Sequence, residues 1–150
     1  MDIAFYHLTV SPLSKALPKL LEKVLASGAR ALVQCADDAQ VEALNDNLWT
    51  YTTKFFLPHG TAKDGFVEEQ PIYLAADEKL PPNGAQILAL VGTSWRNDVN
   101  NFQRCLYLFD GANTLETDEA RRRWKIWRDE NKNLSYWQQD AKGSWIKKEL

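Results

Sequence analysis

The first third of the chain alternates between short apolar runs and longer amphipathic ones, and this alternation restricts the fold more than any other feature. Ile3–Leu8 and Ala29–Cys35 are short and mostly apolar, which is typical of buried strands. Between them, leucine and valine recur at helical spacing over Leu13–Leu25, and Ser27-Gly28 ends this helix because glycine readily forms the left-handed cap. Asp37–Trp49 predicts a second helix that begins at an aspartate cap. A strand-helix-strand-helix opening predicts a parallel sheet.

The rest of the chain continues this pattern. We predict strands at Pro71–Leu74, Gln86–Val91 and Cys105–Phe109, a short helix at Asp98–Phe102, a helix at Glu116–Asn131 capped by Thr114 or Thr117, and a hairpin of Leu134–Gln138 and Ser144–Lys147 around Asp140–Gly143, with loops at Tyr51–Phe66 and Asp77–Gly84. The length of 150 residues suits one domain. We therefore expect a single α/β domain over residues 1–150. Its expected architecture is a mostly parallel sheet with helices on both faces, a Rossmann-like or nucleotide-binding-like outline, and a C-terminal hairpin.

The residues that nucleotide chemistry needs are missing from this outline. The first strand is followed by His7–Pro12, which contains no phosphate loop, and no glycine-rich dinucleotide motif occurs in the chain. Without those glycines the backbone amides cannot cradle a phosphate, so an NTPase is disfavoured. His59 is expected to pack within its loop, and Cys35 and Cys105 lack metal-ligand spacing and lie in apolar runs. We predict no catalytic residue, no metal and no cofactor.

No feature of the sequence suggests export or a membrane. The start of the chain carries Asp2, and His7 interrupts the apolar run that a signal peptide would need. No run approaches the roughly 20 apolar residues of a membrane span. Two free, buried cysteines fit a reducing compartment, so the expected location is cytoplasmic.

The C-terminal part of the chain is locally basic. Residues 117–150 hold nine Lys/Arg and six Asp/Glu, whereas residues 1–116 hold nine and fourteen. Within Ala120–Arg128, five cations and two tryptophans occur in nine residues. A basic segment on an acidic body favours an acidic partner over a general affinity for nucleic acid.

Helical geometry separates the members of this basic segment. At 100° per residue, one stripe holds Thr117, Arg121, Trp124, Lys125 and Arg128. Ile126 and Trp127 fall elsewhere and are expected to pack inward. Arg122 and Arg123 also lie off the stripe, and we interpret them as general surface charge. The stripe itself is either an ordinary solvated face or a binding surface for an acidic, aromatic ligand.

A second concentration of aromatic residues follows the second predicted helix. Trp49, Tyr51, Phe55 and Phe56 lie close together around Pro58 and cannot all reach the core of the sheet. Such a cluster is either a satellite core beneath a loop or a patch that anchors a partner. Both interpretations stay open at the level of composition.

Several segments together resemble one family. They are Phe5–Leu8, Gly28–Val33, Cys35–Asp37, Leu48–Tyr51, Phe56–Gly60, Pro71–Leu74, Ala120–Arg128, Leu134–Trp137 and Gly143–Trp145. In this order and spacing they resemble the chi subunit of bacterial DNA polymerase III. The likeness extends over nearly the whole chain, and the spacing from Trp49 to His59 joined to the Arg/Trp helix is its most specific part.

The resemblance implies an accessory protein of the clamp loader with a nucleotide-binding-like fold and no nucleotide chemistry. Its implied partners are the psi subunit and the acidic, Phe-ended C-terminal tail of single-stranded DNA-binding protein, with only indirect contact to DNA. The psi-binding residues carry over as Trp49, Phe56, Pro58 and His59, a patch that a competing helicase also uses. The tail-binding residues carry over as Arg121, Trp124 and Arg128, to which the stripe adds Lys125.

The chain departs from the family pattern at several positions. A cation of the family is replaced by Thr117, where Lys125 can compensate. Phe55 replaces a small polar residue, which would enlarge the aromatic patch. Asp110 and Gly111 occupy a rim that is more apolar in the family, and Asp110 would repel an acidic tail that it faced. An alternative function uses the same Arg/Trp helix to bind single-stranded nucleic acid, with cations on phosphates and tryptophan on bases.

Overall fold

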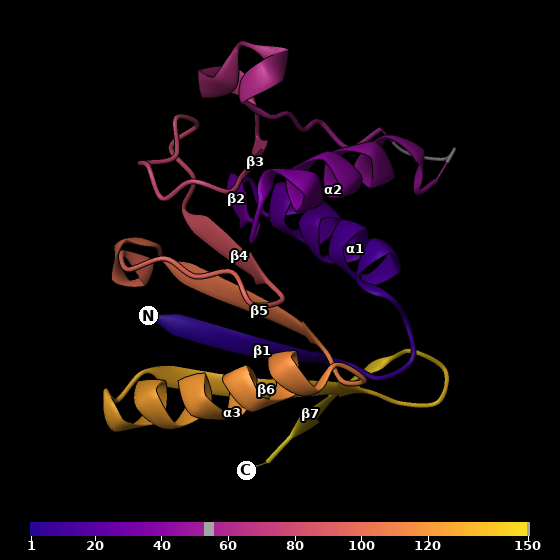
Figure 1. The fold of residues 1–150 in the computed structure, drawn as a ribbon, viewed down its shortest axis with the longest axis vertical. Helices are drawn as coiled ribbons and strands as arrows, with labels where there is room; N and C mark the ends of the chain where they lie inside the picture. The colour runs from indigo at the N-terminus through magenta and orange to yellow at the C-terminus, as the bar shows by residue number, and fades with distance from the viewer. Residues whose placement is uncertain (53–55, 150) are drawn as a thin grey trace.

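The computed structural model describes residues 1–52 and 56–149, and its centre is a seven-stranded sheet (Figure 1). The strands are β1 (Asp2–Leu8), β2 (Ala31–Gln34), β3 (Ile72–Ala75), β4 (Ile87–Val91), β5 (Arg104–Asp110), β6 (Asn133–Gln139) and β7 (Trp145–Lys148). Their order across the sheet is β3-β2-β4-β5-β1-β6-β7. All pairs are parallel except β6 with β7, which form an antiparallel hairpin. The predicted mostly parallel sheet and C-terminal hairpin are therefore confirmed.

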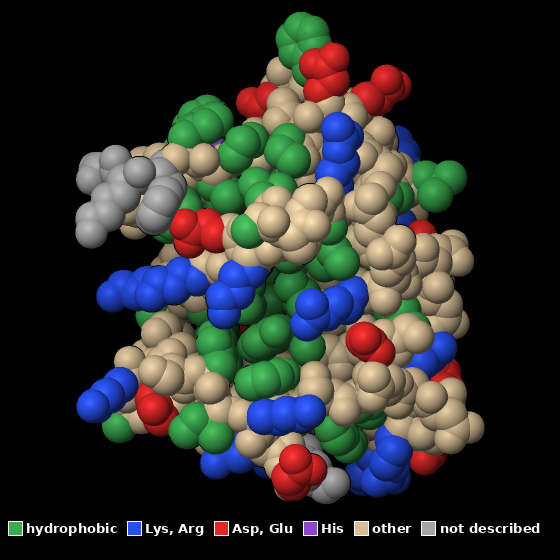
Figure 2. Space-filling model, turned by 180° about the vertical axis from the view of Figure 1, so that it is seen from behind, with side chains coloured by type: hydrophobic (Ala, Val, Ile, Leu, Met, Phe, Trp, Pro, Cys, Tyr) green, Lys and Arg blue, Asp and Glu red, His purple; other side chains and the backbone are tan. Residues whose placement is uncertain are grey.

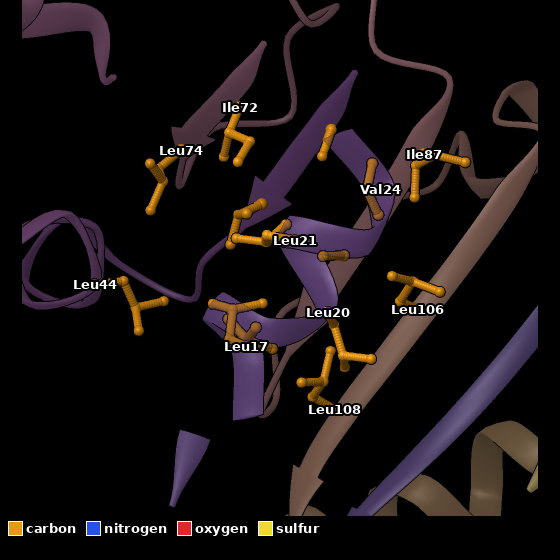
Figure 3. Packing of buried hydrophobic residues seen from close by; sticks show 14 of the residues in the cluster. Leu17, Leu20, Leu21, Val24, Leu44, Ile72, Leu74, Ile87, Leu106 and Leu108 are labelled. Carbon is orange, nitrogen blue, oxygen red and sulfur yellow. The ribbon is translucent and has the colours of Figure 1, made fainter. Parts of the chain in front are cut away.

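Helices cover both faces of the sheet, as predicted. The helices are α1 (Leu13–Ala26), α2 (Asp38–Thr50) and α3 (Thr114–Asp129), with short 3-10 helices η1 (Ala62–Asp64), η2 (Val67–Glu69) and η3 (Val99–Asn101). On one face, α1 and α2 pack over the half of the sheet made by β2 to β5. Leu17, Leu20 and Leu21 of α1 are buried there against Leu106 and Leu108 of β5 (Figure 3). On the other face, α3 lies along β1 and β6 (Figure 1).

The ends of the helices follow from local chemistry. The carboxylate of Asp37 accepts from the backbone N–H of Gln40 at 2.8 Å, which confirms the predicted cap of α2. Gly28, directly after α1, has a φ of +84°, the left-handed geometry expected of it. The predicted cap of α3 is wrong, because the side chain of Asn113 accepts from Glu116 N–H at 3.1 Å. Thr114 and Thr117 lie inside the helix instead.

The connections around β4 contain no α-helix, and a buried arginine holds them in place. The short helix predicted at Asp98–Phe102 is the single 3-10 turn η3. Arg96, which is fully buried, donates to Gln34 Oε1 at 3.0 Å and to the carbonyl of Lys79 at 2.9 Å. Its ion pair with Asp98, at 2.7 Å, offsets the cost of burying the charge. Arg96 thereby ties the loop after β3 to the loop after β4.

The segment after α2 contains more order than the loop predicted over Tyr51–Phe66. It includes η1, and Gly60 forms a parallel bridge with Tyr73 at the outer edge of β3. Since β3 is an edge strand, this bridge covers part of its open hydrogen-bonding edge. Across residues 1–52 and 56–149, none of the helices has the length and apolar character to span a membrane.

Candidate functional site

The predicted basic-aromatic stripe lies along one groove between α3 and the end of the sheet. Thr117, Arg121, Trp124, Lys125 and Arg128 all line this groove, which has a volume of about 710 Å³. Its other side chains come from the ends of β1, β5, β6 and β7: His7, Phe109, Tyr136, Gln138, Lys148 and Glu149. We call this groove the tail pocket. The four residues predicted from the sequence as one binding set are thus brought together by the fold.

The floor of the tail pocket is aromatic. His7 stacks on Phe109 with the ring centres 4.8 Å apart, and the Tyr136 hydroxyl lies 2.8 Å from Nδ1 of His7. Trp124 meets Tyr136 edge to face at 5.7 Å and Phe5 at 5.0 Å. Edge-to-face packing of this kind holds each ring in one orientation, so the floor is preformed.

No sequence pattern assigned His7, Phe109 and Tyr136 to a site. These residues come from three strands that are far apart in the chain, so no local spacing joins them. The one sequence pattern that bears on them is the alternation of side chains along a strand, which places Tyr107 and Phe109 on the same face. That signal places Phe109 on a sheet face but does not say which helix end lies above it.

The surroundings of His7 in this floor favour its neutral form. Burial lowers the pKa of its imidazole, the positive charge of Arg121 lowers it further, and Asp110 acts in the opposite direction. Gly111 lies directly against the ring. A Cβ at Gly111 would lie 2.4 Å from Nε2 of His7 and 2.8 Å from the backbone oxygen of Leu8. Only glycine fits at this position with His7 and Leu8 as they are placed.

The rim of the tail pocket is cationic and open to solvent. The side chains of Arg121 and Arg128 are 80% and 62% exposed, and each has a loose ion pair with an aspartate, at 3.8 Å to Asp118 and 3.6 Å to Asp129. Exposed pairs of this kind contribute little, so an anionic ligand can displace them. Lys125 is also exposed.

Of the positions that depart from the family pattern, Thr117 lies in the tail pocket and Asp110 lies outside it. Thr117 lines the tail pocket, but its side chain is neutral and its hydroxyl donates to the carbonyl of Thr114 at 3.1 Å, so the charge of the family cation is missing there. Asp110 does not line the tail pocket. It lines the neighbouring pocket, and its carboxylate accepts from Ala112 N–H at 2.9 Å. Its charge still reaches His7.

Two predictions about α3 are wrong. Arg123 is not general surface charge: it is 3% exposed, pairs with Glu119 at 3.0 Å, and lies over the rings of Trp95 and Tyr107. Ile126 does not pack inward, since it is 40% exposed. Trp127 is buried as predicted. A pattern that assigned charged residues outward and apolar residues inward failed because two aromatic rings and a carboxylate sit where Arg123 points.

The second predicted set lies at the end of α2. Trp49 and Phe56 are 54% and 67% exposed, and their ring centres are 5.4 Å apart. His59 is buried behind them, 4.8 Å from the Trp49 ring, with Nδ1 2.6 Å from the carbonyl of Leu57. Pro58 is half-buried. We call Trp49, Phe56, Pro58 and His59 the aromatic patch; Phe55, predicted to enlarge it, lies outside the described residues.

The place where related folds bind phosphate is filled by the protein itself. In open α/β sheets, ligands bind beyond the carboxyl ends of the strands. There, the backbone N–H groups of Thr9, Val10 and Ser11 donate to one atom, Oε1 of Gln139, at 3.0 to 3.2 Å. Asp110 and Glu116 line the adjoining pocket and would repel a phosphate. The occupied backbone N–H groups and the two carboxylates therefore disfavour nucleotide binding independently of the missing glycines.

Both cysteines are buried thiols, and no metal-binding cluster occurs in the described part of the chain. Burial raises the pKa of Cys35 and of Cys105 to about 12, so both stay protonated thiols. Among residues 1–52 and 56–149, no three His, Cys, Asp or Glu side chains are grouped to hold a metal ion.

Comparison with known proteins identifies the relatives of this chain. Residues 1–135 match the sequence model of the family described as "DNA polymerase III chi subunit, HolC". The "Probable DNA polymerase III subunit chi" of Rickettsia prowazekii (strain Madrid E) is 38% identical over 90 residues, which are 60% of this chain and 54% of that protein. The "DNA polymerase III subunit chi" of Escherichia coli (strain K12) is 29% identical over 109 residues, 73% of this chain and 74% of that protein. The chain thus spans about half the length of the Rickettsia relative.

Proposed function

The chain belongs to the DNA polymerase III chi subunit family, and we propose that it is an accessory subunit that joins psi to single-stranded DNA-binding protein. In this proposal psi docks on the aromatic patch and the acidic, Phe-ended tail of single-stranded DNA-binding protein docks in the tail pocket. The protein contributes binding and no catalytic step. The psi subunit would tether it to the clamp loader.

One observation carries the tail assignment: an aromatic floor and a cationic rim occur in the same groove. A peptide that ends in phenylalanine after several aspartates needs an apolar surface for its ring and cations for its carboxylates. Phe109, Trp124 and Tyr136 supply the first, and Arg121, Lys125 and Arg128 supply the second. Arginine can also hold the terminal carboxylate through two parallel hydrogen bonds.

The psi assignment rests on exposure and rigidity at the aromatic patch. Two large rings that are more than half exposed are costly to leave in water and are common as anchors of protein interfaces. Trp49 is fixed from behind by His59, so it loses little conformational freedom on binding. A helicase that competes for the same patch is also part of the proposal.

A peptide titration tests the tail assignment. A fluorescently labelled acidic peptide ending in phenylalanine is titrated with the wild-type protein and with Arg121→Glu. We expect the variant to bind at least about tenfold more weakly, since the change removes a charge-assisted contact and adds a repulsion. Arg121 is exposed, so the substitution should leave the fold intact.

Arg122→Glu is the matched control. It changes the net charge by the same amount on the same helix, but Arg122 lies beside Glu119 and outside the tail pocket. Tail affinity within about twofold of wild type is expected for this control, because only screened, longer-range charge changes. Equal binding by wild type and Arg121→Glu would remove the tail pocket from the proposal.

A further inference from the structure

One half of the sheet has no helix on its second face. On the side opposite α3, α1 and α2 pack over β2 to β5, and Ala4 and Tyr6 of β1 are buried at the border of that core, whereas β6 and β7 have no helix above them in the described part of the chain (Figure 1). The side chains on this open face come from alternate positions of each strand: Ala4, Tyr6, Ser135, Trp137, Trp145 and Lys147. This surface is separate from the tail pocket, because the sheet lies between them.

The open face carries three aromatic rings that contact one another: Tyr6 is buried, and Trp137 and Trp145 are partly exposed. Tyr6 stacks nearly parallel to Trp137, with ring centres 6.4 Å apart, and meets Trp145 edge to face at 5.1 Å. Nε1 of Trp137 donates to the hydroxyl of Ser135 at 3.1 Å, two residues earlier on the same face. This hydrogen bond holds the Trp137 indole in one orientation on the open face. Trp137 and Trp145 are both half-exposed.

Cations border these rings on both sides. Arg104 and Lys147 are exposed and line a shallow pocket with Trp137 and Ser135. The single carboxylate in that lining is Asp2, which accepts a hydrogen bond from Asn133 at 2.7 Å. Figure 2 shows this side of the molecule, where hydrophobic side chains form a strip with Lys and Arg above and below it.

Helix α1 supplies the cations on the second side. Glu22 lies on the flank of α1 that faces the end of α2: burial raises the pKa of Tyr51, and the carboxylate of Glu22 beside that phenol raises it further. At 100° per residue, Lys19 and Lys23 are turned from Glu22 toward the other flank, along the open half of the sheet. Both lysines are exposed.

We propose that this sheet groove, formed by Trp137, Trp145, Lys19, Lys23, Arg104 and Lys147, binds single-stranded nucleic acid. Bases stack on the partly exposed indoles, and phosphates lie along the bordering cations. Stacking on aromatic side chains of an open sheet is a common way to hold unpaired bases. The tail pocket differs, because it is concave and has arginines placed for carboxylates, whereas this surface is open and mostly lysine-bordered. The nucleic-acid contact is thereby placed on the face opposite the Arg/Trp helix.

The test is fluorescence anisotropy with a fluorescein-labelled oligothymidylate and the full chain. We expect wild type to bind with an affinity that falls as salt increases. The double variant Lys19→Glu, Lys23→Glu should weaken binding at least about tenfold and reduce the steepness of the salt dependence. Trp137→Leu should weaken it about fivefold through lost stacking.

The matched control reverses two charges on the other face. Arg121→Glu, Lys125→Glu has the same change in net charge, and we expect it to bind the oligonucleotide within about twofold of wild type. Saturating acidic, Phe-ended peptide should also leave the oligonucleotide bound. Retained binding of that peptide by the Lys19→Glu, Lys23→Glu variant shows that the variant is folded.

Three results would overturn the groove assignment. They are no binding of oligonucleotide by wild type at low salt, equal losses in the two double variants, and displacement of the oligonucleotide by the peptide. None of these results decides whether the tail pocket binds the acidic peptide, because the peptide titration with Arg121→Glu tests that assignment independently.

Discussion

The tail pocket and the aromatic patch present aromatic rings in opposite ways. In the tail pocket, the rings form a floor whose members contact each other, and exposed cations surround it. In the aromatic patch, Trp49 and Phe56 project into solvent, and His59 packs against Trp49 from behind. The first surface is suited to a small anionic group with one ring, and the second to a broad apolar surface. The difference teaches that one fold can offer an electrostatic site and a hydrophobic site whose ligands need not compete.

The largest effect is expected at the patch. Phe56→Ala removes a ring that is 67% exposed, so the fold should be unaffected, but loss of an interface anchor typically costs about 2–4 kcal/mol. We expect psi affinity to fall by roughly 30-fold or more in a calorimetric titration. Phe66→Ala is the matched control, since Phe66 is 78% exposed and lies outside the patch. Similar psi affinity in both variants would contradict the assignment of the patch.

A change at the floor of the tail pocket should weaken the binding of the acidic peptide and leave the binding of psi unchanged. In Gly111→Ala, the new Cβ would meet His7 and the backbone of Leu8, so the floor must shift, at a cost of about 1–3 kcal/mol in stability. We expect the acidic peptide to bind about tenfold more weakly and psi to bind normally. Thermal unfolding measures the first effect and the two titrations the second. Unchanged peptide binding together with a lower Tm would show that the floor is not part of the ligand site.

Salt should separate the two surfaces without any substitution. The cations of the tail pocket are largely exposed, so their attraction for an anionic peptide is screened as ionic strength increases. We expect peptide affinity to fall several-fold between low and physiological salt, and psi affinity to stay within about twofold. Equal salt dependence for both ligands would mean that the patch also relies on charge.

The smallest effect concerns the imidazole in the floor. Burial and the charge of Arg121 lower the pKa of His7 in the folded protein, whereas its pKa in the unfolded chain is about 6.5. Between these two pKa values the unfolded chain binds more protons than the folded chain. The contribution of His7 to the free energy of unfolding is therefore complete above the unfolded pKa and is lost as the pH falls toward the folded pKa. We expect a small decrease in the urea midpoint between about pH 7 and pH 5.5. The decrease should be smaller in His7→Gln, and an identical decrease in both would exclude His7 as its source.

Much of the fold could be predicted because its signals are local. The spacing of leucines gave α1, Asp37 gave the start of α2, and apolar runs gave the strands to within a few residues. The errors lie where two local signals compete. Thr114 and Thr117 are good caps by composition, but Asn113 precedes them at the point where the chain leaves the turn after β5. Periodicity also placed Ile126 inward, although no neighbouring element covers it.

The candidate site also has a part that local sequence patterns predict and a part that they do not. Helical geometry alone put Arg121, Trp124, Lys125 and Arg128 on one stripe, and the structure places all four along one groove. Nothing local indicated that Arg123, in the middle of the basic run, is buried against Trp95 and Tyr107. The same is true of Gln139, whose side chain reaches back across the sheet to the loop after β1.

The alternation of strands and helices, the missing phosphate-binding glycines and the cationic stripe could all be predicted, because each depends on residues within a few positions of one another. What lies opposite that stripe depends on how the strands pair in the folded protein. Strand β1 pairs with β5 on one side and with β6 on the other, and these contacts join residues more than 90 positions apart. That pairing brings His7, Phe109 and Tyr136 together beneath α3 and leaves Trp137 and Trp145 partly exposed on the opposite face. Successive side chains of a strand point to opposite faces, so strand order, which no local pattern encodes, fixes both surfaces at once.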